Sequence, residues 1–278
     1  MILSIASGKG GTGKTTVAVN LALSLGAVRL IDCDVEEPNC HIFLKPEVGA
    51  REDVCIMVPH RDESLCDNCG KCADFCRFNA LAVSSGIFMS FPELCHGCGG
   101  CILVCPNGAL TEEPRSIGEI LHGSCGDISV SWGLLNIGEA MATPLIAQLK
   151  NKMDPLQDTI LDAPPGTSCA AIGAVIESDF CILVTEPTPF GLNDLTLAVE
   201  MLESLSVPHG VIINRDGIGD DKVEEYCERK GIPILLRIPH DERIALLYSE
   251  GMPFVDDMPE YRTMFADMMS AIREMITK

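Results

Sequence analysis

A glycine-rich stretch near the N-terminus, residues 8–16, carries two lysines and three threonines. Its pattern is G-x4-G-K-[ST], in which Lys14 would contact the β- and γ-phosphates of a nucleotide and the Thr15 hydroxyl would bind Mg²⁺. Glycines let backbone N–H groups close around phosphate oxygens, and a helix that begins there adds a favourable dipole. The stretch predicts a phosphate-binding loop for ATP and Mg²⁺. The expected nucleotide contacts in it are Gly8, Lys9, Gly10, Gly11, Thr12, Gly13, Lys14, Thr15 and Thr16.

The second chemically distinctive region holds eight cysteines between residues 66 and 105. They form two runs with the spacing C-x2-C-x2-C-x3-C: Cys66, Cys69, Cys72 and Cys76, then Cys95, Cys98, Cys101 and Cys105. Bacterial two-cluster ferredoxins have this spacing, and the fourth cysteine of each run ligates the other cluster. We therefore expect two 4Fe-4S clusters, one on Cys66, Cys69, Cys72 and Cys105 and one on Cys95, Cys98, Cys101 and Cys76. Zinc sites also use C-x2-C pairs, but four cysteines in each run favour iron–sulfur clusters.

The bulk composition bounds the remaining possibilities. The chain has 278 residues, 47% of them hydrophobic, which is enough for one large domain or a domain with an insert. Its formal charge of −20 argues against nucleic acid and anionic membrane surfaces, because both attract basic patches. No apolar run reaches the length of a membrane span, and a strand followed by the phosphate loop does not fit a signal peptide.

The redox compartment follows from the cysteine usage. Fifteen cysteines without a secretory signal indicate metal ligands rather than disulfides. We therefore expect a cytoplasmic protein in a reducing cell. Outside the cassette, Cys169 is expected to be buried as core packing, because free cysteine commonly lies in the interior.

Strands that alternate with helices must position these residues. Apolar runs predict strands at 2–6, 28–31, 159–162, 181–185, 211–215 and 234–239, with helices between them. This alternation predicts an α/β fold with a doubly wound, mostly parallel sheet. Because the cassette interrupts it, we expect an ATPase domain at 1–55 and 116–278 with an inserted small α+β ferredoxin domain at 56–115.

Three segments of the chain resemble one family. The phosphate loop carries a second lysine, Lys9, and resembles the deviant Walker A loop of the MinD/ParA family, whose relatives include the nitrogenase iron protein and the Mrp-type iron–sulfur carrier ATPases. Asp32-Cys33-Asp34 resembles that family's first switch region, and residues 162–166, Asp-Ala-Pro-Pro-Gly, resemble its Walker B and second switch region. With the cassette, the whole chain is similar to MinD-superfamily ATPases that carry an inserted ferredoxin domain.

The resemblance implies particular roles for single residues. Lys9 would cross a homodimer interface to the partner's nucleotide, and Asp34 would orient or activate the attacking water. Asp162 would hold the Mg²⁺ shell, and the Gly166 N–H would sense the γ-phosphate. The residues expected to carry hydrolysis are Lys9, Lys14, Asp34 and Asp162, and those expected at the base are Asn214, which would recognise adenine, and Pro239.

Three functions fit these motifs. The first is ATP-dependent electron transfer, in which nucleotide binding at a dimer interface changes the potential of the clusters, since exposure and nearby charge tune that potential. The acidic surface would then favour a protein redox partner with a basic docking face. The second is a cluster carrier like the Mrp ATPases, which present a cluster on a C-x2-C pair; outside the cassette this chain has no such pair. The third is a MinD-like regulator with a redox-sensing insert. We favour the first.

Overall fold

The computed structural model describes residues 1–154 and 156–277, and the chain divides into two compact units. Unit 1 comprises Met1–Arg51, Ile120–Leu134 and Ile146–Lys278, and unit 2 comprises Glu52–Glu119 and Leu135–Leu145. The expected boundaries at residues 55/56 and 115/116 fall inside two long strands, β3 (Glu47–Arg61) and β6 (Leu110–Cys125), which run continuously from one unit into the other. The expected last segment ends at Lys278, outside the described residues.

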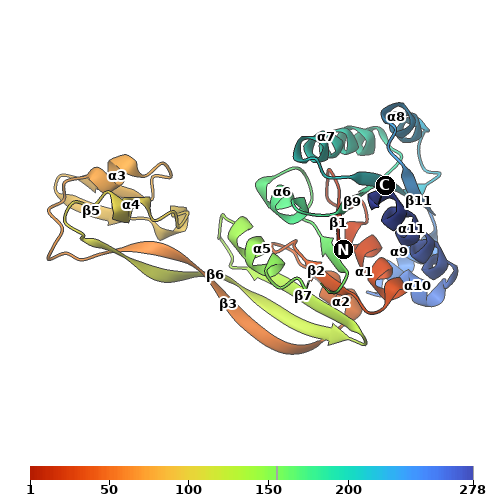
Figure 1. The fold of residues 1–278 in the computed structure, drawn as a ribbon, viewed down its shortest axis with the longest axis horizontal. Helices are drawn as coiled ribbons and strands as arrows, with labels where there is room; N and C mark the ends of the chain where they lie inside the picture. The colour runs from red at the N-terminus through yellow and green to blue at the C-terminus, as the bar shows by residue number, and fades with distance from the viewer. Residues whose placement is uncertain (155, 278) are drawn as a thin grey trace. The chain divides into compact units, whose positions relative to one another are not determined.

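The described residues form a nine-stranded sheet in the order β11-β10-β9-β1-β8-β2-β7-β6-β3 (Figure 1). Neighbouring strands from β11 to β7 are parallel. These strands are β1 (Ile2–Ala6), β2 (Arg29–Asp32), β7 (Ile128–Leu135), β8 (Thr159–Asp162), β9 (Phe180–Thr185), β10 (His209–Asp216) and β11 (Ile234–Pro239). The predicted doubly wound, mostly parallel sheet is confirmed.

The register of the central strands brings the expected site residues to one edge. Asp32 pairs with Asp162 across β2 and β8, and Ile5 pairs with Asp162 across β1 and β8. Because parallel strands present their carboxyl ends at the same edge, the phosphate loop after β1 lies beside both acidic strand ends.

Helices cover both faces of the sheet, as a doubly wound fold requires (Figure 1). On one face α1, α10 and α11 pack together, and on the other α6 contacts β1 and β8 while α7 contacts β9. In the described residues outside the cysteine cassette, the helices are α1 (Lys14–Leu25), α2 (Cys40–Leu44), α5 (Thr143–Lys150), α6 (Cys169–Val175), α7 (Pro189–Leu205), α8 (Lys222–Lys230), α9 (Glu242–Ser249), α10 (Phe254–Asp257) and α11 (Glu260–Ile276).

The C-terminal helix α11 belongs to the core. Tyr261, Phe265, Met268 and Ile272 are buried, at the spacing of one helical face. They join the same hydrophobic cluster as the strand residues of the sheet. Within the described residues, no helix combines the length and the apolar character needed to cross a membrane.

Between β3 and β6, unit 2 contains several short elements. Two antiparallel strands, β4 (Leu81–Ser84) and β5 (Ile87–Ser90), accompany α3 (Lys71–Phe75), a 3-10 turn η1 (Pro92–Leu94) and α4 (Gly100–Leu103). One of its hydrophobic clusters consists of Leu81, Cys101 and Leu110, with other cysteines of the cassette packed against them.

Asn20 offers a test of the packing that holds α1. Its Nδ2 donates to the Thr16 carbonyl, and its Oδ1 accepts from the Val255 N–H at 2.9 Å while the residue is 2% exposed. We expect Asn20→Ala to lower the free energy of unfolding by about 1–3 kcal/mol, because the buried Val255 N–H loses its acceptor. Chemical denaturation followed by circular dichroism measures this. Ser24→Ala is the matched control, because Ser24 lies on the same helix and its hydroxyl donates to the Asn20 carbonyl; an equal loss in both variants would contradict the prediction.

Candidate functional site

A cavity opens beside the phosphate loop at the carboxyl ends of the strands. It is lined by Gly10, Gly11, Gly13, Lys14, Thr15, Thr16, Asp34, Asn214, Pro239 and neighbouring residues of β10, β11 and α9. The structure therefore brings together most of the residues that the sequence assigns to the nucleotide. Gly8, Lys9 and Thr12 belong to the same loop without lining this cavity, and Gly166 lies behind the loop, where its N–H donates to the Ser7 carbonyl at 2.9 Å.

The phosphate loop depends on Gly13 and Asn214. Gly13 has a φ of 97°, in the left-handed region, and a Cβ there would lie 2.4 Å from Asn214 Nδ2. That amide donates to the Thr12 carbonyl at 2.8 Å, and its Oδ1 accepts from the Arg215 N–H. Asn214 thus fixes the loop backbone while it lines the cavity. Its contact with adenine stays a prediction.

Two buried carboxylates lie under the loop. Asp162 accepts a hydrogen bond from the Thr15 hydroxyl at 2.5 Å and one from the Cys40 thiol at 3.5 Å. Asp32 accepts from the backbone N–H groups of Asp34, Asn39 and Cys40, and so it holds the segment that follows β2. Burial raises the pKa of both carboxyls, and the nearby charge of Asp32 adds to the effect on Asp162.

The Asp162 side chain fits a hard metal ion. Its Oδ1 is buried and has no hydrogen-bond partner within the described part of the chain, while Oδ2 meets the Thr15 hydroxyl. A free carboxylate oxygen beside a hydroxyl is an all-oxygen donor set, which Mg²⁺ prefers, and a cation there would offset the cost of burying the charge. That Asp162 and Thr15 hold Mg²⁺ stays a prediction.

Asp34 faces the cavity rather than the interior. Partial burial, and next the charge of Asp32, raise the pKa of its carboxyl to about 6. A carboxyl with such a pKa accepts a proton near neutral pH more readily than an ordinary aspartate does. Asp34 can therefore act as a base toward a molecule bound in the cavity.

Sequence reasoning missed Glu186, which follows β9. Its buried carboxylate pairs with Arg215 at 2.6 Å and with Lys9 at 3.6 Å. The signal available in the sequence was an acidic residue at the carboxyl end of a predicted strand, where open α/β sheets bind ligands. Lys9 thus contacts an acidic side chain of its own chain.

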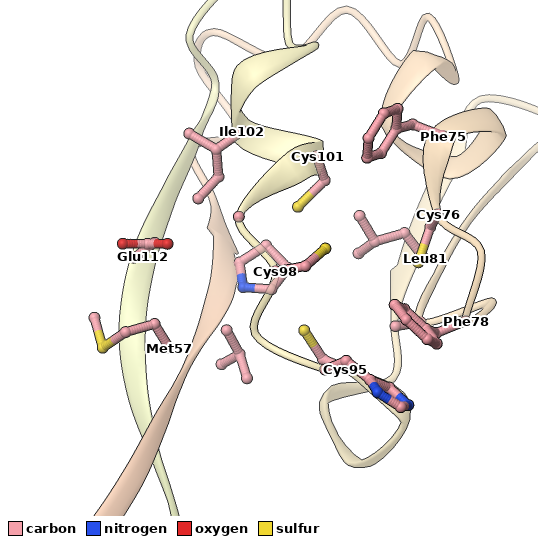
Figure 2. Close-up of a pocket in the computed structure, with 15 residues that line it drawn as sticks. Met57, Phe75, Cys76, Phe78, Leu81, Cys95, Cys98, Cys101, Ile102 and Glu112 are labelled. Carbon is pink, nitrogen blue, oxygen red and sulfur yellow. The ribbon is translucent and has the colours of Figure 1, made fainter. Parts of the chain in front are cut away.

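In unit 2 the eight cysteines of the cassette line two cavities. One is lined by Cys76, Cys95, Cys98 and Cys101 with apolar neighbours such as Phe75, Phe78 and Leu81 (Figure 2). The other is lined by Cys66, Cys69, Cys72 and Cys105 with Val83, Phe88 and Leu110. Each cavity therefore takes three cysteines from one run and the fourth from the other. That these thiols ligate iron stays a prediction.

The electrostatics of the cavities disfavour bare thiolates and favour a positively charged group between them. Burial, and then the charges of Cys95 and Cys98, raise the pKa of Cys101 to about 11, so several thiolates cannot coexist there without a cation. Backbone N–H groups already point at sulfur: Gly97 donates to Cys95 Sγ at 3.4 Å and Ala109 to Cys105 Sγ at 3.2 Å.

The other cysteines lie outside these cavities. Cys33, Cys40, Cys181 and Cys227 are buried, Cys125 is half-buried and Cys55 is exposed. Cys169 is exposed as well, so the expectation that it packs in the core is wrong. The reason is local: Cys169 begins α6, and the buried residues of that helix start two positions later, at Ala171.

The fold and the loop define a P-loop nucleotide-binding protein of the doubly wound class. A family model described as the CobQ/CobB/MinD/ParA nucleotide binding domain matches residues 3–254, and the chain belongs to this family of P-loop ATPases.

Individual relatives agree with that family. An uncharacterized protein of Methanocaldococcus jannaschii is 31% identical over 269 residues, which cover 94% of each chain. The iron-sulfur cluster carrier protein of Pyrococcus abyssi is 26% identical over 91% of this chain and 78% of that relative. Among solved structures, the septum site-determining protein MinD of Pyrococcus horikoshii, complexed with Mg-ADP, covers 96% of this chain and 93% of its own at a TM-score of 0.59. At 21% identity it bears on the fold alone.

Gly13→Ala tests the phosphate loop. We expect at least tenfold weaker nucleotide binding, because the Cβ would displace Asn214 and an alanine at this φ costs about 1–3 kcal/mol. Calorimetric titration with ADP measures the affinity. Gly26→Ala is the control: Gly26 also has a positive φ, 78°, but a Cβ there would meet no atom, so stability should fall while affinity is kept. Wild-type affinity in Gly13→Ala would contradict the assignment of this loop.

Proposed function

We propose that the protein is an ATPase that couples a nucleotide-driven conformational change in a homodimer to electron transfer through two 4Fe-4S clusters. The observation that carries the proposal is the cross-pairing of the cysteine runs, in which each cavity combines three cysteines of one run with the fourth of the other. This arrangement ties both clusters into one small fold, which suits retained redox centres better than clusters that are handed on.

The cavities have the chemistry that a cubane cluster requires. Four thiolates would supply all ligands of each cluster. One cavity offers Cys66, Cys69, Cys72 and Cys105, and the other offers Cys95, Cys98, Cys101 and Cys76. The cluster would supply one-electron redox chemistry. The N–H groups that point at sulfur and the apolar lining would tune its potential, because hydrogen bonds to sulfur and solvent exposure are the levers on that potential.

The nucleotide site supports ATP hydrolysis by residues of this chain. Lys14 would contact the β- and γ-phosphates, and Thr15 and Asp162 would hold Mg²⁺, which would neutralise the phosphate charge. Asp34 would orient or deprotonate the attacking water from the cavity wall. The Gly166 N–H now bonds the Ser7 carbonyl, so contact with a γ-phosphate requires this segment to move. We therefore propose that the segment around Gly166 changes conformation when it senses the γ-phosphate.

A shift of the switch regions could be transmitted to unit 2 through paired strands and the chain connection between β7 and β6. Asp32 ends β2 and pairs in register with Trp132 of β7 and with Asp162 of β8. β7 is joined to β6 by a two-residue turn, and β6 runs out of unit 2. A shift of β2 or β8 would therefore act on strands that continue toward the clusters.

The proposed partners follow from charge. A chain with a net charge of −20 would dock a redox protein with a basic face, and it would not bind nucleic acid. We place the protein in the cytoplasm, where oxygen-sensitive clusters and free thiols survive.

A cluster carrier is the second candidate, favoured by relatives that are named iron-sulfur cluster carrier proteins. A carrier would release iron to an acceptor during ATP turnover, whereas an electron-transfer protein would keep it. A MinD-like regulator remains the third alternative, and it would need neither iron release nor a nucleotide-dependent potential.

Iron content and potential separate these functions. We expect about eight irons per chain after anaerobic purification, from two clusters of four. Spectroelectrochemistry should show potentials that differ with and without Mg-ATP or a non-hydrolysable analogue. A tenfold preference of the nucleotide for one oxidation state corresponds to about 59 mV, and by linkage reduction changes nucleotide affinity by the same factor. Iron loss to an apo-acceptor on turnover would favour the carrier, and potentials that ignore nucleotide would overturn coupling.

The cross-pairing has its own variant test. Cys105→Ser should remove or alter the cluster of the first run, Cys66, Cys69 and Cys72, although Cys105 belongs to the second run. Electron paramagnetic resonance of the reduced protein resolves the two clusters. Cys55→Ser, which changes an exposed cysteine outside both cavities, should keep the full iron content.

The proposed base predicts a pH profile. Asp34 must be deprotonated to accept a proton, and its pKa is raised to about 6. The kcat/KM of ATP hydrolysis should therefore fall as the pH drops through about 6, because this parameter reports groups of the free enzyme. Asp34→Asn should lower kcat by about 10²–10⁴-fold and remove the acid limb. In the control Glu36→Gln, which changes an exposed neighbour, the limb should persist. An unchanged limb in Asp34→Asn would assign it to another group.

A further inference from the structure

Glu186 is a buried carboxylate with two cationic partners. It follows β9, and its side chain is 8% exposed. Oε1 contacts Arg215 Nη1 at 2.6 Å, and Oε2 lies 3.6 Å from Lys9 Nζ. A buried carboxylate needs at least one such partner, because a buried unpaired charge is strongly destabilising. Either Arg215 or Lys9 could meet this need, so one of the two can be released.

Lys9 and Lys14 of the same loop have separate partners. Lys14 lines the nucleotide cavity, whereas Lys9 is absent from the described residues that line it and turns toward Glu186. The backbone beneath Lys9 is held, since the Ser7 hydroxyl donates to the Lys9 carbonyl at 2.6 Å. The Lys9 side chain is 33% exposed, so its ammonium can leave Glu186 by rotation of the side chain alone.

The backbone of Glu186 is fixed in place, so it cannot move with Lys9 when that side chain leaves. Its carbonyl accepts from the Thr188 N–H at 2.8 Å, and a Cβ on Gly191 would lie 2.2 Å from that carbonyl oxygen. A Cβ on Gly219 would lie 1.3 Å from the Pro187 carbonyl oxygen, so the loops after β9 and β10 are in close backbone contact. Glu186 is therefore a fixed acceptor, and Lys9 is the mobile member of the pair.

We infer that Glu186 is a positioning residue that holds Lys9 inside its own subunit and must release it before a second copy of this chain can use it. The inference rests on the proposed nucleotide-dependent dimer, in which Lys9 reaches the phosphates bound by the partner. The carboxylate and those phosphates compete for one ammonium. When Lys9 leaves, Arg215 keeps Glu186 paired, so release exposes no uncompensated buried charge. The Glu186–Lys9 ion pair thereby opposes dimerisation, and nucleotide binding must supply the free energy to break it.

The neutral variant Glu186→Gln tests this. A partly exposed ion pair contributes about 0.2–1 kcal/mol, and a twofold dimer releases two lysines, so the dimer dissociation constant should fall about 2- to 30-fold. It is measured by sedimentation or light scattering of the anaerobic, cluster-loaded protein with a saturating non-hydrolysable ATP analogue. Glutamine can still accept from Arg215, which protects the fold. A purely structural Glu186 would change the constant in the opposite direction, because its loss would loosen the site.

Two further variants keep the inference falsifiable. Glu203→Gln is the matched control: Glu203 forms an ion pair of 3.1 Å with Lys230 on exposed positions of α7 and α8, and its loss should leave the constant unchanged. Arg215→Gln should weaken the dimer, because Lys9 then becomes the remaining cation on Glu186. Since Arg215 lines the nucleotide cavity, this comparison is made at saturating nucleotide.

The outcomes separate the proposed role of Glu186 from the proposed nucleotide-dependent dimer on which it rests. A wild-type protein that dimerises with the analogue, together with a Glu186→Gln constant that is unchanged or higher, overturns the role of Glu186 and leaves the dimer standing. A chain that stays monomeric in every variant overturns both. A wild-type monomer that dimerises only as Glu186→Gln supports the inference in its strongest form.

Discussion

The structure depends on placing two carboxylates, Asp32 and Asp162, side by side at the buried ends of neighbouring parallel strands. Burial raises both pKa values, so the folded chain binds protons that the unfolded chain would release. For such groups the stability is greatest below the ordinary pKa of aspartate and declines as the pH rises through the raised values. Lys14, whose charge lowers the pKa of Asp162, offsets part of this cost. A bound cation would offset more of it, which is consistent with the Mg²⁺ that we propose for this site.

That constraint organises the surrounding backbone. The carboxylate of Asp32 accepts hydrogen bonds from three N–H groups of the segment 34–40, which fixes Asp34 at the cavity wall. Among the described residues, Asp162 accepts hydrogen bonds from a hydroxyl and a thiol, and its Oδ1 has no partner there and could bind a ligand. One carboxylate is thus structural and the other is available for binding, although their positions in the strands are equivalent.

Much of this could be predicted from the sequence where a local pattern has a local physical cause. The phosphate loop and the short apolar strands are such cases, because glycine spacing and continuous hydrophobic runs report backbone conformation and burial directly. The strands β3 and β6 could not be predicted in this way. The first seven residues of β3, 47–53, are all exposed, so no apolar alternation marks them. The contact between Lys9 and Glu186 joins residues 177 positions apart and depends on the register of the sheet. The prediction that Cys169 is buried failed because the general tendency of cysteine to lie in the interior does not say which face of a helix turns inward.

The strands β3 and β6 also bear on how such a chain can arise. They are hydrogen-bonded neighbours, so the segment between them begins and ends at adjacent points of one ladder. The entropy of closing a loop grows only with the logarithm of its length, about 0.6 kcal/mol for each doubling. A hairpin at this edge of an ancestral ATPase could therefore lengthen into a cysteine-rich module at little thermodynamic cost to the host sheet. Insertion within a β-hairpin is thus an evolutionary route that this ladder permits.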